Sequence, residues 1–175
     1  MKKITAYEIA LSALATALAT VFLTVGVYTE ILLFTGYLFA GLALMLPLSK
    51  RSFVGYILAY IATCLLALIF TSFRFWDLLP FAIFFGLHPL VNECQLCTKY
   101  NRWVWFGIKA VWFDISMFVT WKFLLAMTTS LGGYEKFILP IILIVGTAFF
   151  YVYDNLTFRC RAVVNTLVKR INKRK

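Results

Sequence analysis

The chain has 175 residues, of which 63% are hydrophobic and only 14% charged, and its formal net charge is +10. A soluble domain is typically about half apolar and about a quarter charged. This composition excludes an ordinary soluble domain and predicts an all-α polytopic integral membrane protein. The basic excess then reflects membrane topology rather than binding to nucleic acid, because Lys and Arg collect in cytoplasmic loops.

Apolar runs separated by polar interruptions predict six transmembrane helices in one domain, residues 1–158. A spanning helix needs about 20 residues, so we expect the short second and fourth segments to be tilted or kinked, the fourth at its two prolines. The basic start before the first segment also fits a cleaved signal peptide. Because the apolar run continues far enough to span, we expect a retained helix instead. The segments are Tyr7–Val27, Ile31–Leu48, Phe53–Thr71, Leu78–Asn92, Trp103–Met127 and Phe137–Leu156.

The distribution of Lys and Arg predicts the orientation of these segments. With both termini in the cytoplasm, thirteen basic residues lie inside, whereas the outer side holds Arg74, Lys136 and, near the end of a helix, Lys122. This bias fits the positive-inside rule and an even number of spans. The inner residues are Lys2, Lys3, Lys50, Arg51, Lys99, Arg102, Arg159, Arg161, Lys169, Arg170, Lys173, Arg174 and Lys175.

The basic tail, residues 159–175, reads RCRAVVNTLVKRINKRK and repeats apolar residues near a helical spacing. One interpretation is an amphipathic helix on the inner leaflet, attracted by anionic lipid. The other is a frayed basic end that only enforces the topology. The sequence leaves both open.

Among the ionisable residues within the apolar segments, we select two as candidates for function, because such groups are costly inside a bilayer. Asp114 lies in the middle of the fifth segment, and His88, the only histidine, lies in the inner half of the fourth. We expect them to form a buried polar pair that fixes the packing of these two helices. A polar pocket or proton relay is the functional alternative.

The four cysteines do not predict a disulfide framework or a metal site. Cys94 and Cys97 form a C-x-x-C, but no second such pair or nearby histidine completes four ligands. On the cytoplasmic side we expect free thiols, with palmitoylation as an alternative. Catalytic motifs such as G-x-S-x-G and H-E-x-x-H are absent from the sequence, so we expect neither an enzyme nor a cofactor.

Aromatic and charged residues gather in the predicted outer loops. Such a mixture suits a pocket for a small amphipathic molecule, although an interfacial aromatic belt also explains the Trp and Tyr residues. The candidate substrate-binding residues are Tyr28, Glu30, Arg74, Trp76, Asp77, Trp121, Lys122 and Tyr134.

The first segment differs from the rest because alanine recurs in it at helical spacing. Ala13 and Ala17 form an A-x-x-x-A motif, and Ala15 and Ala19 form a second one. Small residues at this spacing let another helix approach closely inside lipid. With six spans, inside termini and this length, the chain resembles the substrate-binding S component of an energy-coupling factor (ECF) transporter.

The resemblance implies a membrane subunit that binds a small solute, such as a vitamin or its precursor, at its outer side. It also implies that Ala13 and Ala17 dock onto a transmembrane coupling subunit driven by two ATPases, in a bacterial plasma membrane. The turn at 27–31 is too short for the lid that this family often carries, and the His-rich start of its metal-specific members is missing. A stand-alone small membrane protein, acting on lipids or as an immunity or accessory factor, is the alternative function.

Overall fold

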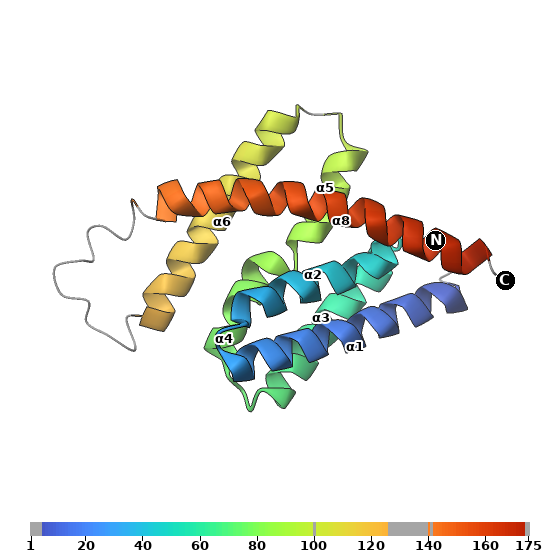
Figure 1. The fold of residues 1–175 in the computed structure, drawn as a ribbon, viewed down its shortest axis with the longest axis horizontal. Helices are drawn as coiled ribbons and strands as arrows, with labels where there is room; N and C mark the ends of the chain where they lie inside the picture. The colour runs from blue at the N-terminus through green and yellow to red at the C-terminus, as the bar shows by residue number, and fades with distance from the viewer. Residues whose placement is uncertain (1–4, 100, 126–139, 141, 174–175) are drawn as a thin grey trace.

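The computed structural model describes residues 5–99, 101–125, 140 and 142–173, and this part of the chain is helical between its turns and contains no strand. The all-α prediction is therefore confirmed. Figure 1 shows the arrangement. In chain order the elements are α1 (Ala6–Thr29), α2 (Leu33–Leu48), α3 (Phe53–Phe70), α4 (Phe75–Pro80), the π-helical turn η1 (Phe81–Phe85), α5 (His88–Cys97), α6 (Arg102–Leu125), the π-helical turn η3 (Ile142–Gly146) and α8 (Thr147–Lys173).

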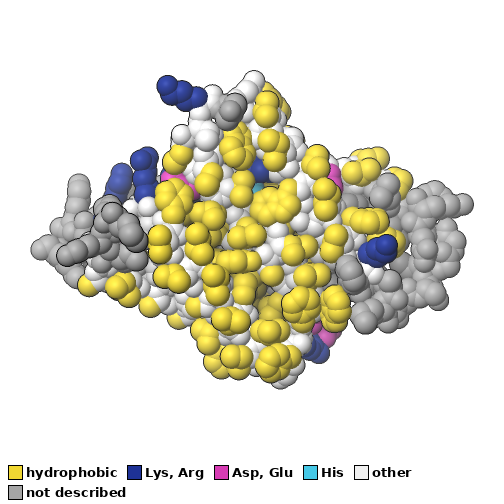
Figure 2. All heavy atoms as spheres, turned by 180° about the vertical axis from the view of Figure 1, so that it is seen from behind, with side chains coloured by type: hydrophobic (Ala, Val, Ile, Leu, Met, Phe, Trp, Pro, Cys, Tyr) yellow, Lys and Arg dark blue, Asp and Glu magenta, His cyan; other side chains and the backbone are white. Residues whose placement is uncertain are grey.

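The protein is a membrane protein by the length and apolar surface of its helices. Four helical stretches are long and apolar enough to cross a bilayer: 6–29, 53–70, 75–97 and 102–122. The 16-residue α2 is apolar but shorter. The face turned away from the viewer in Figure 1 is covered by apolar side chains, with basic groups near its margins (Figure 2). Exposed apolar surface of this extent indicates contact with lipid.

The helices α1, α2 and α3 lie side by side and form the first half of the bundle (Figure 1). The capping residue Thr5 starts α1 by accepting a hydrogen bond from the backbone of Glu8, whose carboxylate accepts in return from the Thr5 backbone N–H. Where α1 and α2 cross, a Cβ on Gly36 would lie 2.7 Å from the carbonyl oxygen of Phe22. Glycine at this position therefore allows the two backbones to touch.

The predicted fourth segment is a broken helix, divided into α4, η1 and α5. Gly86 N–H donates to Phe81 in a π-helical bond, and Leu90 N–H donates to Leu87, so the carbonyls of Ala82 and Gly86 lose their ordinary helical partners. The hydroxyls of Tyr60 and Tyr56, one turn apart on α3, donate to these two carbonyls. The break persists in an apolar environment because α3 satisfies its free backbone groups.

The last helix departs most from the prediction. The tail was expected to follow the sixth span as a separate element, but α8 runs through residue 158 without a break. Of the predicted sixth span, residues 137–139 and 141 lie outside the described residues. The start of α1 and the end of α8 lie at the same end of the molecule (Figure 1), and there Lys50 Nζ sits 5.4 Å from the centre of the Tyr7 ring. This arrangement agrees with an even number of crossings, while the side of the membrane stays a prediction.

Candidate functional site

A network of buried polar side chains joins α5, α6 and α8. Lys109 on α6 donates to Asp154 Oδ1 at 2.5 Å and to Asn92 Oδ1 at 2.8 Å. His88 Nε2 lies 3.1 Å from the same Asp154 oxygen. His88 and Lys109 have no exposed surface, and Asp154 is only 4% exposed. One carboxylate oxygen thus holds three helices together.

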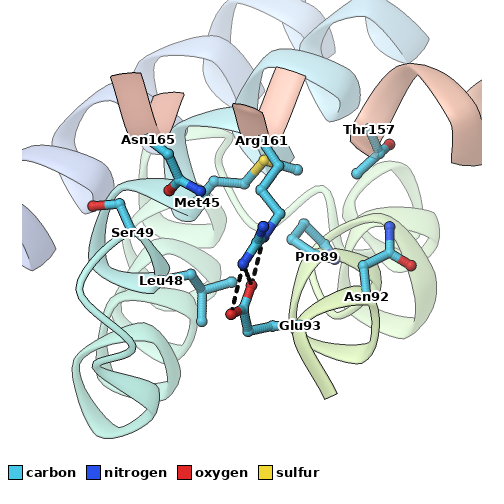
Figure 3. A pocket seen from close by; sticks show the side chains of 9 residues that line it. All are labelled: Met45, Leu48, Ser49, Pro89, Asn92, Glu93, Thr157, Arg161 and Asn165. Atoms are coloured by element: carbon cyan, nitrogen blue, oxygen red, sulfur yellow. Dashed lines mark hydrogen bonds and ion pairs between the residues drawn. The ribbon is translucent and has the colours of Figure 1, made fainter. Parts of the chain in front are cut away.

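A second ion pair lies next to this network, between α5 and α8. The guanidinium of Arg161 reaches from α8 to Glu93 and makes a bidentate contact, with N–O distances of 2.6 and 2.8 Å (Figure 3). The Glu93 side chain is 1% exposed, whereas that of Arg161 is 28% exposed. Planar bidentate pairs of this kind are the stronger class of ion pair.

The charges of the two pairs cancel, because Lys109 faces Asp154 and Arg161 faces Glu93. An isolated charge inside a membrane protein costs several kcal/mol, so such groups normally pair with each other. The ring of His88 packs against Tyr153, Phe84 and Phe150, at centroid distances of 4.8, 5.3 and 5.7 Å. The aromatic packing and the neutral charge sum favour a structural role for this network, as a joint between helices.

Two polar atoms of the network lack a partner among the described residues, namely Asn92 Nδ2 and His88 Nδ1. Asn92 also lines a small cavity of about 10 Å³, between the end of α2, α5 and α8 (Figure 3). A cavity of this size holds about one water molecule. Its lining residues are Met45, Leu48, Ser49, Pro89, Asn92, Glu93, Thr157, Arg161 and Asn165.

The expected pair of His88 with Asp114 is wrong. His88 bonds to Asp154 instead, and the Asp114 carboxylate accepts a hydrogen bond of 3.1 Å from the Thr147 hydroxyl. The sequence placed both residues at suitable depths in neighbouring segments. It did not show that α8 would bring its own carboxylate to His88.

The network and the adjacent ion pair contain residues that the sequence analysis did not select: Lys109, Asn92 and Asp154 in the network, and Glu93 in the ion pair. A signal for two of them was present in the sequence. Lys109 interrupts the fifth apolar segment, and Asp154 interrupts the sixth with the opposite charge. Opposite charges in two apolar segments favour an interhelical pair.

The predicted outer pocket is partly assembled at the turns after α1 and α3. Arg74 lies 3.6 Å from Glu30 and 3.8 Å from Asp77, and it donates to the Val27 carbonyl. The Tyr28 hydroxyl donates to Phe70 at 2.9 Å. These contacts tie the two turns together at the surface.

The remaining members of the predicted pocket are less closely placed. Trp76 lies in the first turn of α4, two residues after Arg74. Trp121 and Lys122 lie near the end of α6, a helix that packs against α4. Tyr134 lies outside the described residues. A binding role for this set stays a prediction.

The alanines of α1 divide between two sides of the helix. Ala15 and Ala19 are fully buried against the bundle. Ala13 and Ala17, the predicted docking residues, are exposed. The two A-x-x-x-A motifs therefore have separate surroundings, one inside the protein and one on its surface.

The cysteines are all free in the structure, with Cys94 and Cys97 exposed on α5. Within the described residues, no group of three or more His, Cys, Asp or Glu side chains is placed to hold a metal ion. No family model matches the chain, and no curated protein or solved structure shows significant similarity to it.

Proposed function

We propose that this chain is the substrate-binding membrane subunit of an ECF-type importer for a small solute, such as a vitamin or its precursor. The observation that carries the proposal is the division of alanines on α1. Ala15 and Ala19 have no exposed surface, whereas Ala13 and Ala17 face outward. The bundle does not need the outer pair for its own packing, so a partner helix has access to them.

The exposed alanine side is longer than the motif alone. Ala6 and Ala10 are exposed as well and continue it at helical spacing. Because apolar burial gives little driving force inside lipid, helices associate there through close van der Waals contact. A strip of methyl groups supports such contact with a transmembrane coupling subunit, which two ATPases would energise.

The proposed solute site lies at the other end of α1, at the cluster of Tyr28, Glu30, Arg74 and Asp77. Ala13 and Ala17 lie in the first half of the helix, and Tyr28 lies in its last turn. Binding and docking would thus occupy separate surfaces, as an importer requires when its substrate enters from one side and its energy from the other.

The experiment uses bulky substitutions on two sides of α1. In cells that contain the coupling subunit and ATPases, Ala13→Trp and Ala17→Trp should abolish copurification of these subunits and the associated uptake. Leu18→Trp is the matched control, because Leu18 is already large and 39% exposed on the same helix. Copurification that survives both alanine substitutions would rule out this docking surface.

The alternative of a stand-alone protein acting on lipids predicts another pattern. Deletion of residues 163–175 would then abolish activity, and the alanine substitutions would have no effect. A transport subunit should lose uptake through Ala13→Trp and tolerate the deletion better. Comparing the two variants in one uptake assay separates the hypotheses.

A further inference from the structure

The outward side of α8 carries an apolar stripe along most of the helix. Val152, Leu156, Val163 and Leu167 follow one another at spacings of four, seven and four residues, and each is between 46% and 64% exposed. This spacing keeps them on one side of a helix. Asp154 and Arg161, which bind α6 and α5, are both directed into the protein. Most of the stripe therefore faces away from the bundle, although Leu156 also lines a small cavity against α2.

Two arginines lie within the same stripe. Arg159 follows Val152 by seven residues, and Arg170 follows Val163 by seven, so both belong to this side of the helix. Both are exposed, and the described residues offer them no carboxylate. The sequence contains seven basic residues and no acidic residue after Asp154. The stripe thus combines apolar surface with unneutralised positive charge.

An open groove lies on this side of α8, with a volume of about 360 Å³. Its described lining consists of Ala162, Val163, Thr166, Leu167 and Arg170. Val163 and Leu167 supply apolar surface to this groove, and the guanidinium group of Arg170 lies at its C-terminal end. A ligand complementary to this lining carries an apolar chain and an anionic group.

We infer that the outward side of α8 from residue 159 to 170 binds anionic phospholipid. The phosphate is held by Arg170 and Arg159, and the acyl chains lie against Val163 and Leu167. Arginine suits this role because its aliphatic stem packs on apolar surface while the guanidinium reaches the headgroups. This inference does not depend on the proposed transport function.

The length of α8 supports this placement. A helix of 27 residues is about 40 Å long, which exceeds the hydrocarbon thickness of about 30 Å. A charged side chain at the centre of the bilayer is costly. Both limits are met when the stretch from Arg159 to Arg170 lies along the interface, where headgroups and the first acyl carbons are both within reach.

The test measures lipid binding to the full chain in a neutral detergent by native mass spectrometry. The probes are dioleoylphosphatidylglycerol and dioleoylphosphatidylcholine, which share acyl chains and differ in charge. We expect the anionic lipid to bind more tightly. Arg170→Gln should weaken its binding about 5-fold, and the double substitution with Arg159→Gln about 25-fold, because each basic residue near a membrane surface contributes a similar attraction.

Lys99→Gln is the matched control, because Lys99 is exposed on the connection between α5 and α6, outside the stripe on α8, and its substitution should leave lipid binding unchanged. Helical content and thermal unfolding of each variant show whether it is folded. Equal affinity for the two lipids, or unchanged binding in the double variant, would overturn the inference. So would displacement of the lipid by inorganic phosphate or polyglutamate, which would assign the stripe to a soluble anion or an acidic protein.

Discussion

Replacing Lys109 with methionine tests whether the buried network is a structural joint. The methionine has a similar length but no charge. In the native protein, Lys109 donates to both Asp154 and Asn92 and has no exposed surface. After the substitution, Asp154 keeps only the contact with His88, so a carboxylate stays buried with an incomplete set of donors.

The expected loss follows from the burial of the pair. Removing one partner of a buried ion pair costs about 3–5 kcal/mol, because the other charge is left without compensation. We expect this loss for Lys109→Met and a similar loss for Asp154→Leu. The double substitution removes both charges and leaves only neutral groups, chiefly on His88 and Asn92, without partners, at a cost of about 1–3 kcal/mol.

The assay is reversible unfolding in mixed micelles with increasing dodecyl sulfate, followed by circular dichroism. The free energy of unfolding should be lower in each single variant than in the double variant. Ser116→Ala is the control on the same helix, because the buried Ser116 hydroxyl donates only to Trp112, one turn earlier. Its effect should stay below that of either charge substitution. If the two single losses simply add in the double variant, the lysine and aspartate are not coupled and the proposed joint is wrong.

Two further predictions concern backbone contacts, measured by the same unfolding assay. Gly36→Ala should destabilise the protein by about 1–3 kcal/mol, because its methyl group overlaps the backbone of α1. Gly107→Ala should instead stabilise it by about 0.5–1 kcal/mol, because a Cβ there has nothing within 4 Å and alanine has the higher helix propensity. If both substitutions changed the stability in the same direction, the close crossing of α1 and α2 at Gly36 would be contradicted. Tyr56→Phe and Tyr60→Phe should each cost about 1–3 kcal/mol by freeing a carbonyl in the broken helix, and an unchanged stability would show that these carbonyls have other partners.

The sequence predicted the helices that depend on local apolar runs. The segments expected at 7–27, 53–71 and 103–127 overlap α1, α3 and α6 closely. The irregularity of the fourth segment was also expected from Pro80 and Pro89, since proline lacks the N–H that continues a helix. These features depend on neighbouring residues and are therefore visible in the sequence.

The partner of His88 was not visible in this way. His88 and Asp154 are 66 residues apart, and Asp114 was the nearer carboxylate in a segment of suitable depth. The choice between them depends on how α8 crosses α5 and α6, which is a property of tertiary packing. The continuity of α8 was missed for a related reason. The basic residues that begin at position 159 are typical of the end of a membrane span, but Arg161 is directed inward to a carboxylate on α5.

The two sides of α8 explain how one helix of a membrane protein carries so many charged residues. On the side of α8 that faces the bundle, Asp154 and Arg161 are matched by charges on α6 and α5, which fixes the position of the helix. On the side that faces away from the bundle, Arg159 and Arg170 have no such partner among the described residues, and we infer that they bind lipid. A substitution on the side facing the bundle should therefore change the stability of the fold, and one on the side facing away should change only lipid binding. Because the alanines proposed for docking lie on α1, neither change acts directly on that surface, so stability, lipid binding and the proposed uptake can be measured separately.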